Sequence, residues 1–235
     1  MRRILVVRTG SPTPRARARF GEFTEWFERL LAPEVVTVDA ERGEPFPPLD
    51  RITGVVVTGS MASLTRPEPW MERLERWLLA AGHTVPVLGV CFGHQLLARA
   101  LGGAVERNPR GPEVGTVGVE LTEAGRRDPL FAGLANPLAV QESHEDHVAV
   151  SPPGAVLLAT NAHAPVQAFA HGPRLRGVQF HPEFDLERAR TLCDEERFTL
   201  DHARPGLADE AIASMRATPG AERVLANWVR AYVGA

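Results

Sequence analysis

Two short stretches, far apart in the chain, carry residue types that could together cleave an amide bond. GVCFGHQ, residues 89–95, places a lone cysteine, Cys91, between two glycines where an apolar run becomes helical in pattern. GVQFHPEF, residues 177–184, ends a second apolar run with His181 and Glu183. A thiol needs a base that takes its proton and returns it to a leaving amine, and histidine titrates in the right range. A carboxylate that accepts the other ring proton fixes the histidine tautomer. These three residues are therefore a candidate catalytic triad.

The sequence around Cys91 predicts a sharp turn between a strand and a helix. The apolar segment 85–90 should end at the cysteine, and Gly89 and Gly93 remove side chains where the backbone must crowd. The pattern resembles the G-x-S-x-G elbow of serine hydrolases, with sulfur in place of oxygen. Such an elbow exposes the nucleophile at the carboxyl edge of the sheet, and a helix starting near Phe92 favours the thiolate. The alternative is an inert cysteine buried on an apolar strand, which is common.

The first hundred residues predict an α/β fold with a parallel sheet. Apolar runs at 3–8, 35–38, 52–60 and 85–90 are typical of buried strands. Between them, apolar residues recur at helical spacing. One such stripe, which predicts a single helix ending before Pro33, consists of Phe20, Phe23, Phe27, Leu30 and Leu31. Because strand and helix alternate, we expect a parallel sheet covered by helices on both faces.

From about residue 114 the apolar runs become shorter. Shorter strand-like pieces, which predict a mixed sheet, are VGTVGVEL, PLAVQES, AVLLAT, VQAFA and LRGVQF. Three amphipathic stretches follow, at 185–198, 207–218 and 221–233, and we expect helices there that lie against the sheet. Cys193 shares a helical stripe with Leu186, Ala189 and Phe198, which predicts core packing. We expect one domain over residues 1–235, with a helical C-terminal extension at about 185–235.

Composition narrows the function classes. The formal net charge of −3 and the pI near 6.3 argue against nucleic acid or an anionic membrane surface as the main partner. Two distant cysteines do not form a disulfide framework, and no run is long enough for a signal-peptide core or a membrane span. We therefore expect a cytoplasmic protein without a cofactor. We also expect no metal site in SHEDHV, because the side chains of four successive residues, His144, Glu145, Asp146 and His147, cannot all converge.

GVCFGHQ, followed much later by GVQFHPE, resembles the class I glutamine amidotransferase family. The likeness extends to VVVTGS at 55–60 and to SHEDHV at 143–148, which resembles a segment of GMP synthetase amidotransferase domains. It covers most of residues 1–184. The resemblance implies a flavodoxin-like, mainly parallel sheet with helices on both faces and a mixed-strand extension, which agrees with the pattern of elements above.

The resemblance also implies a role for each matching residue. Cys91 would attack the γ-carboxamide carbon of glutamine, His181 would act as acid and base, and Glu183 would orient the imidazole. The backbone N–H groups of Gly59 and Phe92 would form the oxyanion hole. Ammonia would leave first, and water would then hydrolyse a glutamyl thioester.

Three further residues match family positions that contact the substrate. Gln95 lies one helical turn after the cysteine and would touch the substrate glutamine. Ser143 and His144 match the segment whose backbone receives the α-amino and α-carboxylate groups.

The acceptor of the ammonia is not evident, because no Walker-type phosphate loop follows the matching region. One alternative is a stand-alone hydrolase of γ-glutamyl amides or peptides. The N-terminal segment and the Cys-Phe-Gly-His-Gln elbow resemble stand-alone members of the family, including plant γ-glutamyl peptidases. The second alternative is a glutaminase subunit that donates ammonia to a separate synthetase, and the third is a non-catalytic binding module.

Overall fold

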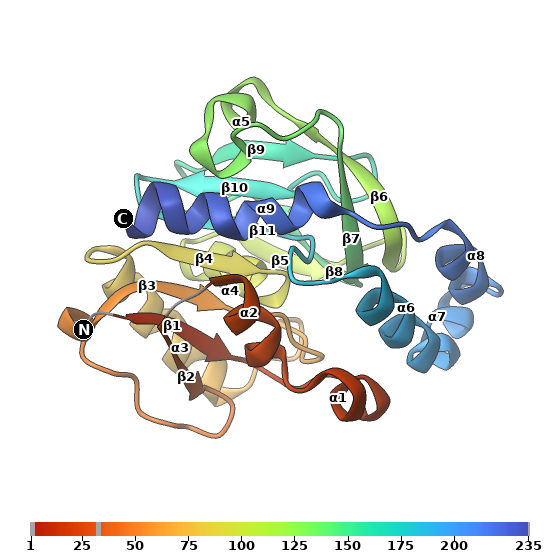
Figure 1. The fold of residues 1–235 in the computed structure, drawn as a ribbon, viewed down its shortest axis with the longest axis horizontal. Helices are drawn as coiled ribbons and strands as arrows, with labels where there is room; N and C mark the ends of the chain where they lie inside the picture. Colours follow the sequence, from red (N-terminus) through yellow and green to blue (C-terminus); the bar gives the residue numbers. More distant parts are fainter. Residues whose placement is uncertain (1–2, 32–33, 235) are drawn as a thin grey trace.

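A nine-stranded sheet organises the residues that the computed structural model describes, which are 3–31 and 34–234 (Figure 1). Its strand order is β2-β1-β3-β4-β11-β10-β9-β6-β7, and β5 and β8 form a separate two-stranded sheet. The strands are β1 (Arg3–Arg8), β2 (Val35–Asp39), β3 (Ile52–Val57), β4 (Val87–Val90), β5 (Ala104–Arg107), β6 (Glu113–Leu121), β7 (Leu138–His144), β8 (Asp146–Val150), β9 (Val156–Thr160), β10 (Ala168–His171) and β11 (Leu175–Val178).

The sheet has a parallel half and an antiparallel half. Strands β2, β1, β3, β4 and β11 pair in parallel, whereas β10, β9, β6 and β7 pair antiparallel to their neighbours. Val178 of β11 lies opposite Val90 of β4. Because parallel strands end at the same edge, the residues that follow these two positions emerge side by side. The predicted flavodoxin-like α/β fold with a mixed extension is confirmed.

Helices cover both faces of the sheet. The helices are α1 (Pro14–Phe20), α2 (Phe23–Leu31), α3 (Pro69–Gly82), α4 (Phe92–Ala100), α5 (Glu123–Arg127), α6 (Leu186–Glu195), α7 (Arg197–Ala203), α8 (Leu207–Ser214) and α9 (Pro219–Trp228). One core cluster joins α2 and α9 to the sheet through Phe27 and Trp228. The opposite cluster joins α3 and α4 to the sheet through Leu74 and Leu96. Within the described residues, no helix combines the length and the apolar character needed to cross a membrane.

The prediction of a single helix before Pro33 is wrong. The chain forms α1 and α2, which Gly21 separates at φ +82°, a conformation that favours glycine. The indole of Trp26 donates a hydrogen bond to the Phe20 carbonyl oxygen across the break. The apolar spacing runs through the break because the half-buried Phe20 of α1 packs against the same apolar cluster as Phe23 of α2, so periodicity alone could not reveal it. Pro33 itself lies outside the described residues.

The C-terminal stretches divide into two groups. Helix α9 lies against the sheet as predicted, with Trp228 fully buried. Helices α6, α7 and α8 instead gather with α1 beside the end of β6, on the right of Figure 1, around a third apolar cluster. Cys193 is buried in that cluster, as predicted, but Phe198 is 86% exposed, so its predicted core packing is wrong. The chain ends α6 before Phe198 and starts α7, which turns this side chain outward.

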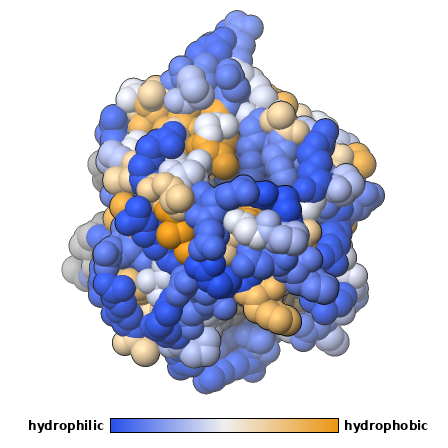
Figure 2. Space-filling model, turned by 90° about the vertical axis from the view of Figure 1, so that its right-hand side faces the viewer, coloured by the Kyte–Doolittle hydropathy of each residue, from blue (hydrophilic) through white to orange (hydrophobic). Residues whose placement is uncertain are grey.

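Glu195, the last residue of α6, ties this helical group to the start of the chain. Its carboxylate accepts hydrogen bonds from the backbone N–H groups of Arg15 and Ala16, each at 2.8 Å, and from the Thr13 hydroxyl. These are the first N–H groups of α1, which have no partner within their own helix. Figure 2 shows this side of the molecule, which is mainly hydrophilic with several separate apolar patches.

Candidate active site

Cys91 lies at the tip of the turn between β4 and α4. Its φ of +49° is the one positive φ of a non-glycine residue within 3–31 and 34–234. A Cβ atom on Gly89 would lie 2.3 Å from the carbonyl oxygen of Gly93, and one on Gly93 would lie 2.4 Å from that of Val57. Both glycines are therefore needed for the backbone to turn this closely. The strained backbone and the crowded glycines are features of a nucleophile elbow.

His181 follows β11 at the same edge of the sheet. Its Nδ1 atom lies 2.7 Å from Oε1 of Glu183, which is 1% exposed. Its ring stacks on Phe184, with ring centroids 3.9 Å apart and planes at 13°. Its backbone N–H donates to the carbonyl oxygen of Gln141 on β7. The stacking on Phe184, the hydrogen bond at Nδ1 and the backbone hydrogen bond together fix the orientation of the imidazole. Nε2 remains as the nitrogen available to a substrate or thiol.

Gly59 brings the thiol and the imidazole to a common point. A Cβ atom on Gly59 would lie 2.9 Å from Cε1 of His181 and 3.7 Å from Cβ of Cys91. The thiol donates a long hydrogen bond, 3.9 Å, to the carbonyl oxygen of Ser143, and His181 Nε2 has no hydrogen-bond partner among the residues described. The thiol and the imidazole are close enough for the charge of the sulfur to act on the pKa of His181.

The electrostatics of His181 favour the imidazolium form. Burial alone lowers the pKa of His181, but the charges of Glu183 and of a Cys91 thiolate outweigh burial and raise this pKa well above its usual value. An imidazolium beside the thiol supports a thiolate, the form of cysteine that attacks a carbonyl carbon. The arrangement can therefore carry out nucleophilic acyl chemistry.

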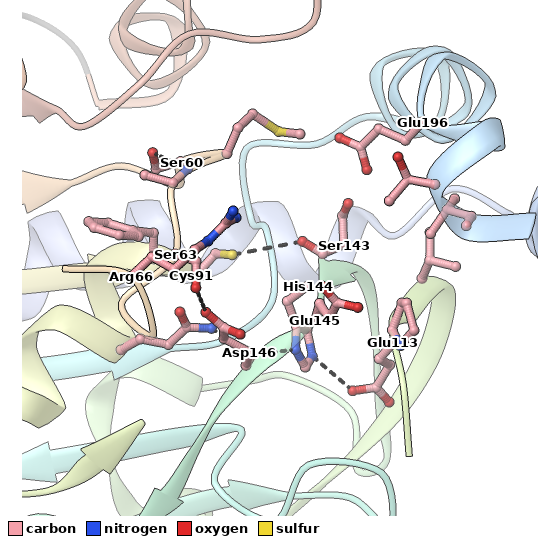
Figure 3. A pocket seen from close by; sticks show the side chains of 18 residues that line it. Ser60, Ser63, Arg66, Cys91, Glu113, Ser143, His144, Glu145, Asp146 and Glu196 are labelled. Atoms are coloured by element: carbon pink, nitrogen blue, oxygen red, sulfur yellow. Dashed lines mark hydrogen bonds and ion pairs between the residues drawn. The ribbon is translucent and has the colours of Figure 1, made fainter. Parts of the chain in front are cut away.

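A pocket of about 250 Å³ opens beside Cys91 (Figure 3). Of the other residues predicted for the site, Phe92, Gln95, Ser143 and His144 also line it. The first N–H groups of a helix have no acceptor inside it, so the N–H of Phe92, which opens α4, is free of the helix ladder. Gly59, His181 and Glu183 do not line this cavity; His181 lies close to Gly59 on the side of Cys91.

Two of the predicted substrate contacts have additional structural bonds. The amide nitrogen of Gln95 donates to the carbonyl oxygen of Asp146 at 2.8 Å and to Oε1 of Gln179 at 3.0 Å. Its carbonyl oxygen remains available as an acceptor. The ring of His144 lies 2.9 Å, through Nδ1, from the carbonyl oxygen of Asp146. Because a carbonyl only accepts, Nδ1 must donate, and the His144 side chain is committed to the protein.

Sequence analysis missed a buried cluster below the pocket. Oε2 of Glu113 and Oε2 of Glu142 lie 3.1 and 3.4 Å from Nε2 of His144, and these side chains could hold a metal ion. Burial, with the charge of Glu113 added, raises the pKa of Glu142 well above its usual range. Burial also acts to raise the pKa of Glu113, but the hydrogen bond and charge of His144 lower it overall. A proton on Glu142 therefore relieves the repulsion between the two carboxyl groups.

The other side chains of SHEDHV diverge. Glu145 pairs with Arg107 and Asp146 accepts from Ser63, whereas only His144 reaches the buried cluster. Glu142 precedes Ser143 on the strand-like segment that the sequence predicts. This position was the signal that could have indicated Glu142 as a residue near the site.

Comparisons with known proteins show what this chain is similar to. A family model described as glutamine amidotransferase class-I matches residues 25–198. The chain belongs to this family. It is 41% identical over 181 residues to the glutamine-hydrolyzing GMP synthase of Thermomicrobium roseum, a match that covers 73% of this chain and 32% of that protein. It is 32% identical over 170 residues to gamma-glutamyl peptidase 5 of Arabidopsis thaliana, covering 71% of this chain and 67% of that protein.

A solved structure supports the same fold over nearly the whole chain. The glutamine amidotransferase of Methylobacillus flagellatus superposes with a TM-score of 0.74 at 24% identity, covering 98% of this chain and 95% of that one. The GMP synthase, by contrast, is a longer protein, of which this chain spans about a third.

Proposed function

We propose that this protein hydrolyses a γ-glutamyl amide bond, in glutamine or in a γ-glutamyl peptide, through a glutamyl thioester on Cys91. The observation that carries the proposal is that Cys91 and the imidazole of His181 both lie close to Gly59. Glu183 accepts a hydrogen bond from this imidazole, and Cys91 lines a pocket. Membership of the family supports the choice of a γ-glutamyl substrate.

Each step of the proposed reaction uses one of the residues described above. The Cys91 sulfur forms a bond to the γ-carbonyl carbon, and the carbonyl oxygen takes up negative charge between the N–H groups of Gly59 and Phe92. His181 gives its proton to the departing amine, so that the carbon–nitrogen bond breaks and a thioester remains. Water then attacks this thioester while His181 takes a proton from the water. The carbon–sulfur bond breaks, so that glutamate leaves and the Cys91 sulfur regains its proton from His181, whose imidazolium form Glu183 stabilises.

The end of β7 and the start of α4 would recognise the rest of the substrate. We assign the α-amino and α-carboxylate groups of the glutamyl unit to the backbone of Ser143 and His144, and a polar contact to Gln95. All three residues line the pocket that contains the thiol.

A second candidate function rests on the relatives. The likeness to a glutamine-hydrolyzing GMP synthase favours an ammonia-donating glutaminase that works with a separate synthetase. In that case the amine released at Cys91 is ammonia and passes to a second protein.

Release of glutamate by the purified protein alone separates the two functions. It should be measured with glutamine and with a panel of γ-glutamyl peptides. Cleavage of peptides without any partner supports the stand-alone hydrolase, whereas glutamine cleavage that appears only with an added synthetase supports the subunit. Absence of both would refute hydrolysis by this site.

A further inference from the structure

The wall of the pocket that faces Cys91 comes from the start of α7. Glu196, Thr199 and Leu200 line the cavity together with the thiol. Figure 3 shows Glu196 across the pocket from Cys91, on the helices of the C-terminal group. The carboxyl group of Glu196 is half-buried and points toward the cavity. The C-terminal extension thus supplies a chemical group to the pocket as well as a cover.

Glu196 differs from the other acidic residues of the pocket. Among the residues that the structure describes, its side chain makes no ion pair and no hydrogen bond, whereas each of the others has a partner. The partners are His144, Asn161 and Gln167 for Glu113, Arg107 for Glu145 and Ser63 for Asp146. An unpaired carboxyl group in a cavity is the group that a ligand can complete.

The surroundings of Glu196 make a cationic ligand the fitting one. Burial raises the pKa of Glu196 to about 7, against the lowering effect of the charge on His181. Burial thus disfavours the charged form of this carboxyl group. A neighbouring ammonium group stabilises the carboxylate form through a charge-assisted hydrogen bond. Arg66 lines the same pocket and is the guanidinium drawn beside Cys91 in Figure 3. Its positive charge repels an ammonium group and so favours the Glu196 side.

We propose that Glu196 binds an ammonium group of the substrate and thereby selects among γ-glutamyl compounds. This inference deepens the proposed hydrolysis and rests on it. Two ammonium groups have this chemistry. One is the α-ammonium of the glutamyl unit, to which Glu196 would add a charged partner beside the backbone of Ser143 and His144. The other is a second amine in the leaving group, beyond the scissile amide. In either case Glu196 is a specificity-determining residue that takes no part in bond breaking.

The test compares four substrates in two matched pairs. Glutamine and 4-carbamoylbutanoate differ only in the α-ammonium group. The γ-glutamyl monoamide of 1,4-diaminobutane and γ-glutamyl-n-butylamide differ in the leaving-group ammonium. The test variant is Glu196→Gln, and the control is Glu210→Gln, which removes a surface carboxylate that pairs with Arg204 on the same helical group.

Loss of the Glu196 charge should raise KM about 10-fold or more for the ammonium-bearing member of one pair, with little change in kcat. The partner lacking that ammonium should keep its KM, and Glu210→Gln should leave all four substrates unchanged. The affected pair identifies which ammonium Glu196 holds. Equal changes for both members of each pair, or no change at all, would overturn the inference.

Binding separates this inference from the proposed hydrolysis. If the wild-type protein cleaves none of the four compounds, their dissociation constants should be measured calorimetrically with Cys91→Ala. A preference for an ammonium-bearing compound that Glu196→Gln abolishes would keep the inference while the hydrolysis fails. Equal affinity within each pair, or no binding, would refute both.

Discussion

Cys91 ends a parallel strand at a positive φ beside an imidazole and a pocket, whereas Cys193 lies within α6 among apolar side chains. Burial raises the pKa of the Cys193 thiol to about 12, and its sulfur donates to the carbonyl oxygen of Ala208 at 3.8 Å. The Cys91 thiol instead lies close to His181, whose pKa is held high by Glu183 and the sulfur in spite of burial. Residue type is the same in the two regions, and only the surroundings separate a candidate nucleophile from a packing residue.

The exposed fraction of the side chain does not distinguish the two cysteines. Both cysteines are nearly inaccessible, at 5% and 2% exposure, so accessibility would rank them together. What separates them is the charge and the strained backbone around the sulfur.

The largest expected effect is on turnover. Replacement of Cys91 by Ala should reduce γ-glutamyl hydrolysis by at least ~10³-fold, because the nucleophile is lost. Replacement of Cys193 by Ala should change turnover per folded molecule little, because this sulfur lies in a separate cluster. Glutamate release and circular dichroism on both variants check this. Comparable activity in a folded Cys91→Ala protein would remove Cys91 from the mechanism.

Gly59→Ala tests the positioning around Cys91. The added Cβ would lie 2.9 Å from Cε1 of His181, so the imidazole must shift. A misplaced base costs on the order of 10²-fold in rate, and kcat should fall accordingly. Gly118→Ala is the matched control, because its Cβ would meet only Pro137, at an ordinary 3.7 Å. Equal kcat values for the two variants would show that His181 is not the base.

Glu183→Gln should shift the pH dependence of thiol alkylation. The carboxylate of Glu183 raises the pKa of His181, so its removal lowers that pKa and weakens the imidazolium that supports the thiolate. The alkylation rate of Cys91 should then fall at pH values where the imidazolium supports the thiolate, by about 10-fold for each pKa unit that His181 loses. Mass spectrometry after timed iodoacetamide treatment measures this. Cys193 serves as the internal control, and an unshifted Cys91 profile would contradict the role of Glu183.

The smallest effect concerns stability in the other region. Cys193→Ser places a hydroxyl group in the apolar cluster of α1, α6 and α8, and should reduce the free energy of unfolding by about 1–2 kcal/mol. Urea titration of wild type and variant measures this difference. A stability loss together with unchanged kcat would show that the cluster around Cys193 does not affect turnover at Cys91. A large loss of kcat would show that it does.

Local crowding explains why the region of Cys91 could be predicted from the sequence. Gly89 and Gly93 are needed by backbone atoms a few residues away or on the adjacent strand, and His181 and Glu183 are neighbours in one short motif. Such contacts leave a pattern in a short stretch of sequence. The parallel strands likewise show as unbroken apolar runs, because both faces are buried.

The helical group and the pocket wall could not be predicted in the same way. Whether Glu196 faces the cavity depends on where α6 ends and on how α1 holds it, which are tertiary contacts across most of the chain. Phe198 continues the apolar spacing of α6 yet is exposed, because a new helix begins before it. The short strands β5 and β8 pair only with each other, and neither carries an apolar run long enough to indicate a strand.

The hydrogen bonds between Glu195 and the first turn of α1 have a consequence for how substrate preference could change in this protein. Glu195 is adjacent to Glu196 in the sequence. The hydrogen bonds from Thr13, Arg15 and Ala16 to Glu195 therefore hold the side of the cavity that would bind a substrate's ammonium group. Exchanges in α1 would therefore alter the substrate preference that we propose for Glu196 without replacing Cys91, His181 or Glu183.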